Sequence, residues 1–338
     1  MTIDRELYLI IIFAIYIFQG ILLIICNGIV EVVLIKHRHL RRQYIILFAQ
    51  IFTDILLGFG FCIAGTGRLI IKKSGCFQIN RRYCLLLPWS IIITWQVLMS
   101  QLMSAVATLM VSTDRLISLL FPMRYFENNY SYQIKQIIFY FGSISLFILI
   151  GFIFSFRDTE SILSDSIKTK TSDVLQPFFA NLNTMIMIVS ASLGVILYII
   201  VYLLSRKHVR RIKNIQTEVS LRLFEARQRK LTITMGVSCV FTLIFYVLPK
   251  CLKFLILGKD DDPMTFNSQL LRVAVAISCN LNPLTNIAAI LIKQDDIACR
   301  VKQLFPECFQ KFYKCDQVMT CTRRTRSIST LSADPRKY

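Results

Sequence analysis

The chain has 338 residues, of which 55% are hydrophobic and only 17% are charged, and its mean hydropathy is +0.57. Soluble domains have about 25% charged and about 45–50% apolar residues, so this composition excludes an ordinary soluble domain and favours a membrane protein with several spans. The formal net charge of +19 would suggest nucleic-acid binding in a soluble protein. Here the basic loops that orient membrane helices explain it, and no nucleic-acid partner is predicted.

Seven apolar segments are long enough to cross a membrane. A spanning helix needs about 20 mostly apolar residues, because each residue rises about 1.5 Å through a hydrocarbon core about 30 Å thick. The predicted spans are Leu7–Ile35, Tyr44–Gly65, Leu86–Phe121, Gln136–Phe156, Phe178–Leu204, Leu231–Leu257 and Ser268–Ile292. The sequence therefore predicts an all-α membrane protein. Its seven-transmembrane helix bundle (residues 7–292) follows a short extracellular N-terminus (residues 1–6) and precedes a cytoplasmic tail (residues 293–338).

The distribution of basic residues predicts the orientation of these spans. With the N-terminus outside, the inner segments are Lys36–Arg42, Arg115–Lys135, Ser205–Lys230 and the residues after Ile292. They hold roughly two-thirds of all Lys and Arg, as the positive-inside rule expects. One outer loop is an exception, because it carries Lys72, Lys73, Arg81 and Arg82. The sequence predicts a multi-pass protein of the plasma membrane with its C-terminus in the cytoplasm.

A short amphipathic helix is predicted directly after the last span, at about residues 294–305. The apolar residues that recur there at helical spacing are Ile297, Val301, Leu304 and Phe305. A helix of this kind lies along the inner leaflet, with membrane lipid as its partner. Three cysteines follow it, and they are either palmitoylation sites or unmodified thiols: Cys308, Cys315 and Cys321.

Costly polar residues recur inside the spans. A charged residue there costs about 2.5–3.5 kcal/mol by insertion scales, so it usually has a partner or a function. The polar positions are Asn27 in the first span, Asp54 in the second, Ser104 in the third and Asn282, beside Pro283, in the seventh. Other notable residues are Asp114 and Arg115 at the inner end of the third span, Tyr198 in the fifth and Pro249 in the sixth.

These residues resemble the signatures of rhodopsin-like (class A) G-protein-coupled receptors. STDRLISLLFPMRY (112–125) is similar to the DRY motif and the loop after it, and NPLTN (282–286) is similar to the NPxxY motif. CNGIVEVVL and FAQIFTDILLG are similar to the signatures of the first two helices. The motifs keep the family's order across all seven spans. The stretch DRLISLLFP is most similar to nematode chemoreceptors of the Srsx type.

The resemblance implies a receptor that converts binding of an extracellular small molecule or peptide into activation of a heterotrimeric G protein. It implies that Asp114 pairs with Arg115 at rest, and that Arg115 is released toward the G protein on activation. The alternative is an arginine that extends to the membrane edge. The further residues of the implied switch are Tyr198, Pro249, Asn282 and Pro283.

The resemblance also implies that Asp54, Ser104 and Asn282 converge in the middle of the membrane, with Asn27 close by, around water and a possible sodium ion. The alternative is a hydrogen-bonded cluster that joins the helices without an ion. No cofactor other than this sodium ion and no further metal is predicted.

The chain departs from the family pattern at several positions. Val247 replaces the aromatic residue two positions before the proline of the sixth span, and Asn286 replaces the tyrosine of NPxxY. The fourth span has no tryptophan. At the inner end of the sixth span stand Arg227, Arg229 and Lys230, so no acid is available there to hold Arg115. This departure predicts a higher basal activity.

The resemblance places a ligand pocket among the outer ends of the third, fifth, sixth and seventh spans. The candidate lining residues are Val97, Gln101, Tyr246, Lys250, Lys253 and Arg272. Their cations could bind an anionic group; alternatively, Lys250 and Lys253 extend to lipid headgroups or pair with nearby acids. The second outer loop lacks the cysteine of the family disulfide, which leaves a local bridge between Cys76 and Cys84 as a prediction.

Other classes of function are less well supported by the sequence. An enzyme is not predicted, because the three histidines (His37, His39 and His208) lie in basic inner loops without acidic partners. A transporter usually shows internal repeats, and none is visible between the two halves. A seven-helix ligand-gated channel or transporter, or a receptor-like protein that does not couple, remains the alternative.

Overall fold

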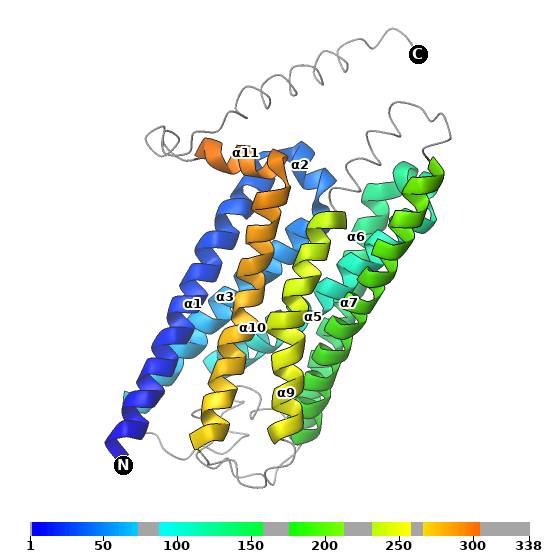
Figure 1. Cartoon of the computed structure of the whole chain (residues 1–338). Helices are drawn as coiled ribbons and strands as arrows, with labels where there is room; N and C mark the ends of the chain where they lie inside the picture. The colour runs from blue at the N-terminus through cyan, green and yellow to red at the C-terminus, as the bar shows by residue number, and fades with distance from the viewer. Residues whose placement is uncertain (1, 74–87, 158–175, 213–231, 258–265, 305–338) are drawn as a thin grey trace.

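A computed structural model shows seven long helices that lie side by side in one bundle (Figure 1). It describes residues 2–73, 88–157, 176–212, 232–257 and 266–304. Within these ranges all regular structure is helical, and seven helices are long and apolar enough to cross a membrane. The predicted all-α seven-helix bundle is confirmed.

The elements follow one another as up-and-down helices. They are α1 (Thr2–Lys36), α2 (Arg38–Gln43), α3 (Ile45–Lys73), α5 (Pro88–Leu120), α6 (Pro122–Arg157), α7 (Pro177–Ile212), a helical segment 232–242, the π-helical turn η3 (Leu243–Val247), α9 (Leu248–Leu257), α10 (Phe266–Lys293) and α11 (Asp295–Leu304). The sixth span, Thr232–Leu255, combines the segment 232–242 with η3 and α9. Figure 1 shows α1 beginning at one end of the bundle, here named the N-terminal end, and α11 lying with α2 across the other, here named the α11 end.

Proline fixes the start of three helices. Pro88, Pro122 and Pro177 are the first residues of α5, α6 and α7, a position where the missing N–H has no helical partner to lose. Only Phe121 separates α5 from α6, so most of the stretch Arg115–Lys135, expected to connect two spans, is helical. Within this stretch Tyr125 contacts Asp114 of α5, and Gln133 contacts Tyr125; hydropathy does not report such contacts.

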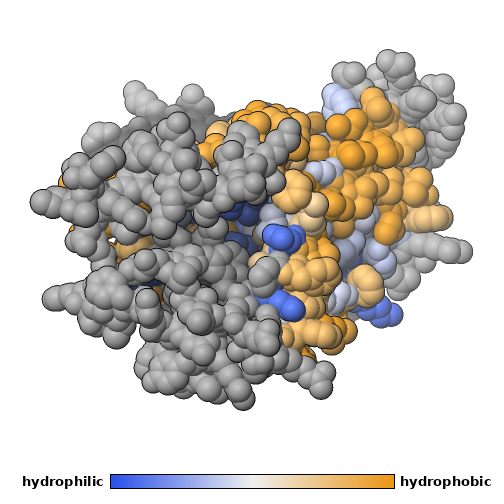
Figure 2. Space-filling view, turned by 90° about the horizontal axis from the view of Figure 1, so that it is seen from below, coloured by the Kyte–Doolittle hydropathy of each residue, from blue (hydrophilic) through white to orange (hydrophobic). Residues whose placement is uncertain are grey.

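The outer surface of the bundle is apolar. Large exposed side chains include Phe18 on α1, Ile138 and Phe139 on α6, and Ile196 on α7. Seen from the N-terminal end, hydrophobic side chains cover a broad flank, and hydrophilic ones are visible between the helices (Figure 2). Lipid tails, rather than water, suit such a surface. The chain is a multi-pass membrane protein.

Two glycines let α1 and α3 approach each other closely. A Cβ on Gly20 would lie 2.6 Å from the carbonyl oxygen of Gly58, and a Cβ on Gly58 would lie 2.8 Å from that of Gly20. Real Cβ atoms essentially never come so close to another atom. The two backbones can therefore approach this closely only because both residues are glycines. Close backbone approach at small residues is a common way to pack membrane helices.

The sixth span contains a π turn immediately before Pro249. Proline lacks an N–H and crowds the carbonyl four residues earlier, which here belongs to Phe245. Ser278 of α10 donates a hydrogen bond to that oxygen over 2.9 Å. The freed carbonyl is therefore satisfied by a neighbouring helix, which lets the turn widen without leaving a buried acceptor unpaired.

Candidate functional site

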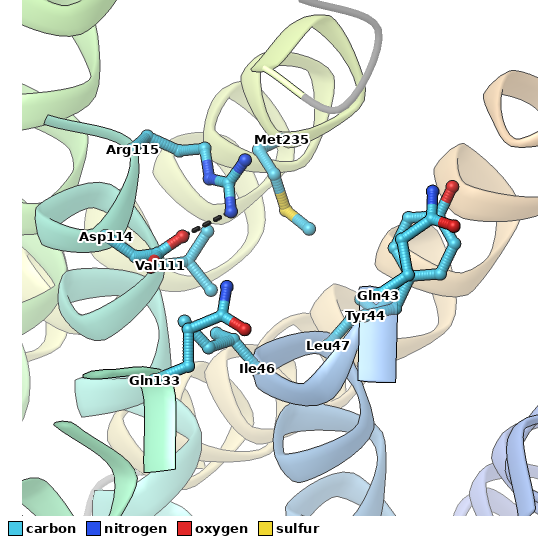
Figure 3. Close-up of a pocket in the computed structure, with 9 residues that line it drawn as sticks. All are labelled: Gln43, Tyr44, Ile46, Leu47, Val111, Asp114, Arg115, Gln133 and Met235. Carbon is cyan, nitrogen blue, oxygen red and sulfur yellow. Dashed lines mark hydrogen bonds and ion pairs between the residues drawn. The ribbon is translucent and has the colours of Figure 1, made fainter. Parts of the chain in front are cut away.

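A buried ion pair lies at the α11 end. Asp114 and Arg115, near the end of α5, are 0% and 4% exposed, and the guanidinium Nη2 donates to Asp114 Oδ2. Figure 3 shows the two side chains pointing toward one another, with Met235 of the sixth span beside the guanidinium. Two buried charges are tolerated only when their remaining hydrogen-bonding groups are also satisfied.

Two residues in the first half of α6 form further hydrogen bonds around this ion pair. The Tyr125 hydroxyl donates toward Asp114, 2.8 Å from Oδ1 and 3.1 Å from Oδ2, and Gln133 Nε2 donates to Tyr125 Oη over 2.6 Å. Burial raises the pKa of the Tyr125 phenol, so this hydroxyl remains a neutral donor. The helix that begins at Pro122 sets Tyr125 in its first turn, facing α5. This cluster of four residues, named the arginine cage, fixes Arg115 against its own helix.

A small cavity adjoins the arginine cage. It has a volume of about 10 Å³, the space of about one water molecule. Its walls come from α3, α5, α6 and the sixth span, as Ile46, Val111, Gln133 and Met235 show (Figure 3). The guanidinium therefore borders a junction of four helices, and separation of the sixth span would open the space beside it.

The part of the sixth span at the α11 end is held by two further contacts. The Tyr198 hydroxyl of α7 donates to the carbonyl oxygen of Thr232, and its ring covers Gly236, where an added Cβ would lie 2.5 Å from Tyr198 Oη. Gln294, between α10 and α11, donates to Thr234 Oγ1 over 2.7 Å and accepts from Tyr44 Oη at 3.2 Å. Because Gln294 is 2% exposed, it joins three parts of the bundle inside the protein.

The four predicted mid-bundle polar residues take part in three separate hydrogen bonds. Ser104 Oγ donates to Asp54 Oδ1 over 3.1 Å, which joins two of the four predicted members. Asn282 Oδ1 accepts from Thr242 at 3.0 Å, and Asn27 Nδ2 donates to the carbonyl of Leu23 over 2.9 Å. A further polar contact of this region joins Ser238 and Asn286.

These pairs have a clear arrangement. Asn282 and Asn286 of α10 both bond to the sixth span, while Asp54 bonds to α5. A carboxylate and a hydroxyl at one point are oxygen ligands that suit a small hard cation. In the described part of the chain no group of three His, Cys, Asp or Glu residues gathers at one place.

The predicted ligand pocket is described only in part. Tyr246 is buried in η3, and Lys250 Nζ lies 5.5 Å from the centre of its ring. Gln101 and Lys253 are half-buried. Val97 and Arg272 lie on α5 and α10, but their side chains are outside the described set. The structure thus brings together Tyr246 and Lys250.

The predicted cysteine chemistry lies outside the described residues. This applies to the pair Cys76 and Cys84 and to the three tail cysteines Cys308, Cys315 and Cys321. It applies also to the basic residues Arg227, Arg229 and Lys230. Free thiols among the described cysteines include Cys26, Cys62, Cys239, Cys251 and Cys279.

Sequence reasoning missed several residues of these networks. Gln133, Thr234 and Gln294 are neutral polar residues at span ends, where such residues are common, so no sequence signal separates them from surface positions. Glu31 is different, because an acid within the first span is visible in the sequence and was overlooked. Comparison with known proteins does not supply a function for any of these residues: no protein-family model and no curated protein matches the chain.

Proposed function

We propose that the chain is a rhodopsin-like G-protein-coupled receptor, resembling nematode Srsx-type chemoreceptors, in which an extracellular ligand controls activation of a cytoplasmic heterotrimeric G protein. The observation that carries the proposal is the arginine cage. A buried arginine is held by its neighbouring aspartate at one end of a seven-helix bundle, beside a span whose inner part has its own polar contacts. Such an arrangement supports a two-state element that a ligand can bias.

In the proposed mechanism the α11 end faces the cytoplasm. At rest Asp114 and Tyr125 retain Arg115 against α5, and the Tyr198 and Gln294 contacts retain the sixth span beside it. Ligand binding at the N-terminal end favours a state in which the sixth span moves away. Arg115 is then free to donate to backbone carbonyls at the C-terminus of a G-protein helix, since a guanidinium presents five donors.

The ligand class is supported by Tyr246 and Lys250. The Tyr246 hydroxyl has no hydrogen-bond partner among the described residues, and the Lys250 ammonium lies over its ring. A hydroxyl and a cation side by side suit a ligand with an anionic group, such as a small carboxylic acid or a peptide carboxylate. A sodium ion at Asp54 and Ser104 is a further part of this proposal, because these two residues supply a carboxylate and a hydroxyl.

The proposal is tested by expressing the chain with a promiscuous G-protein reporter and screening anionic metabolites and peptides. We expect Arg115→Lys to lower ligand-dependent activation by about tenfold or more while surface expression is retained. Lysine keeps the charge that Asp114 needs but lacks the planar fork of donors. A ligand-gated current that needs no G protein, unaltered by Arg115→Lys, would instead identify a channel.

Gln294 is expected to restrain the resting state. The sequence predicts high basal activity because no acid at the end of the sixth span is available to pair with Arg115. The Gln294–Thr234 hydrogen bond is a different restraint on the sixth span. We expect Gln294→Ala to raise basal reporter activity several-fold, because it leaves Thr234 and Tyr44 without this partner and weakens the closed form. The measurement is ligand-free signalling normalised to surface expression.

Gln303→Ala is the matched control for Gln294→Ala. Gln303 lies on α11 and is exposed, and its side chain bonds only at the surface, to Arg300 over 3.1 Å. Its removal should leave basal signalling at the wild-type level. Equal basal activity in Gln294→Ala and Gln303→Ala would show that the buried contact does not restrain the receptor.

A further inference from the structure

Glu31 is a buried acid for which the proposed function has no use. It lies in α1 within the first span, its side chain is 5% exposed, and neither carboxylate oxygen has a hydrogen-bond partner in the described part of the chain. An ionisable group inside a membrane is expensive, so it usually has a partner or a function. Its surroundings show which partner fits.

The α1–α3 contacts place Glu31 in an apolar seam. Cys62 lies beside the Cβ position of Gly20, Ile24 beside that of Gly58, and Ile17 beside that of Gly65. The two helices are antiparallel: from one of these pairs to the next, the residue number on α1 rises by as much as the residue number on α3 falls. The same register places Glu31 opposite Ile51. The buried residues on both helices at this level include the apolar Val30, Leu34, Leu47 and Ile51 and the polar Gln50.

The charged groups near this end of α1 face elsewhere. On α1 itself, Lys36 follows Glu31 by five residues, so the two side chains point in directions about 140° apart around the helix axis. Burial and the nearby cations Arg300 and Lys36 lower the pKa of His37, which follows the last residue of α1.

The other titratable groups belong to the elements that pack on α1. They are Asp54 and Tyr44 on and before α3; Lys293 on α10; Asp295, Asp296, Arg300 and Lys302 on α11; and Arg38, His39, Arg41 and Arg42 on α2. Asp54 bonds to Ser104, and Tyr44 donates to Gln294. Within the described ranges none of these groups forms a hydrogen bond or ion pair with Glu31.

The space around Glu31 limits what can bind there. Two cavities of the described structure have volumes of about 10 Å³ each, and Glu31 borders neither. Surrounding atoms cover both carboxylate oxygens of Glu31, which leaves no room for a hydrated metal ion or a lipid headgroup, whereas a proton needs no cavity. An unpaired carboxylate in an apolar medium costs far more than its neutral acid, so the proton is the favoured occupant.

A second buried acceptor points to the same ligand. Asn27 lies four residues before Glu31, and therefore on the same face of α1. Its Oδ1 is buried and has no donor among the described residues, while Nδ2 donates to the carbonyl of Leu23. A protonated Glu31 carries one O–H, which could donate to Asn27 Oδ1. A single proton would thus satisfy two buried groups that otherwise have no partner.

We propose that Glu31 is a proton-binding site, occupied when α1 and α3 pack as they do here and vacated when this seam opens. Binding takes a proton from water and breaks no bond. A proton bound only in the closed form stabilises that form, so a rise in pH should loosen the seam. The proposal goes beyond G-protein coupling and holds whether or not the chain couples.

The test uses the purified full-length protein in lipid nanodiscs. Its thermal unfolding is followed from about pH 6 to about pH 9, a range that avoids the normal titration of exposed Glu. We expect the unfolding temperature of the wild type to fall as the pH rises, and that of Glu31→Gln to fall much less, because the amide is a permanent mimic of the neutral acid. Asp296→Asn, which removes an exposed acid on α11, should follow the wild type. Equal pH dependence of the wild type and Glu31→Gln overturns the proposal.

A second measurement needs only the wild-type protein. Infrared spectra of protein labelled with ¹³C at its glutamate carboxyl groups distinguish Glu31 from the buried aspartate Asp54. We expect a protonated glutamate carbonyl band at neutral pH that disappears at alkaline pH. Exposed glutamates are ionised at neutral pH, so the absence of this band there would exclude a proton on Glu31.

Discussion

Replacing Asp114 by alanine is expected to destabilise the folded protein by about 3–5 kcal/mol, which is the typical cost of removing one partner from a buried ion pair. The variant leaves the Arg115 guanidinium buried without its counter-charge, and it removes the acceptor of the Tyr125 hydroxyl. The measurement is thermal or denaturant unfolding of the purified protein in nanodiscs at fixed pH.

The double variant Asp114→Leu/Arg115→Met separates charge from packing. It removes both charges and keeps apolar volume, so it should be markedly more stable than Asp114→Ala, since a buried pair can often be replaced by apolar residues at little cost. It should nevertheless lack ligand-dependent signalling, because no guanidinium remains. If Asp114→Ala unfolds at the wild-type temperature, the pair is exposed to water and the arginine cage is not closed.

Alanine at Gly20 or Gly58 is expected to have the second large effect. A Cβ at either position would lie within 3 Å of the opposite backbone oxygen, so the two helices must separate. Overpacking of this kind typically costs about 1–3 kcal/mol, and here it also disturbs the seam that covers Glu31. Surface expression and the unfolding temperature of each variant are the measurements.

Gly28→Ala is the matched control on the same helix. A Cβ at Gly28 meets no atom within 4 Å, and alanine is the better helix former by about 1 kcal/mol. This variant should be as stable as the wild type or slightly more so. If Gly20→Ala were as stable as Gly28→Ala, α1 and α3 would not pack as closely at Gly20 as described above.

The bundle was predictable because lipid imposes a simple rule on sequence. Each span needs a long apolar run, and each of the seven runs became a helix. The ends of the helices were less predictable, because hydropathy falls where a helix leaves the membrane even though the helix continues. Thus α7 extends to Ile212 and α6 begins at Pro122, well before the predicted span.

The candidate site was predictable where charge or proline marked it. Asp114 with Arg115 and Asp54 with Ser104 are joined in the structure as the sequence predicted. Gln294 and Gln133 were not predictable, since their roles depend on partners 60 and 8 residues away in the chain. Pro249 signals a distortion, but whether it is a kink or a π turn depends on Ser278 of another helix.

The π turn beside Pro249 would allow one part of the sixth span to rotate about the helix axis. A π turn holds one residue more than an α turn, and each residue of an α-helix corresponds to about 100° about its axis. If η3 tightened into an ordinary α turn, the inner part of the span would swivel by about that angle relative to α9. Thr234, which faces Gln294, would be carried away from it, and Met235 would leave Arg115. Tightening of the π turn would therefore give the sixth span a second discrete orientation about its axis.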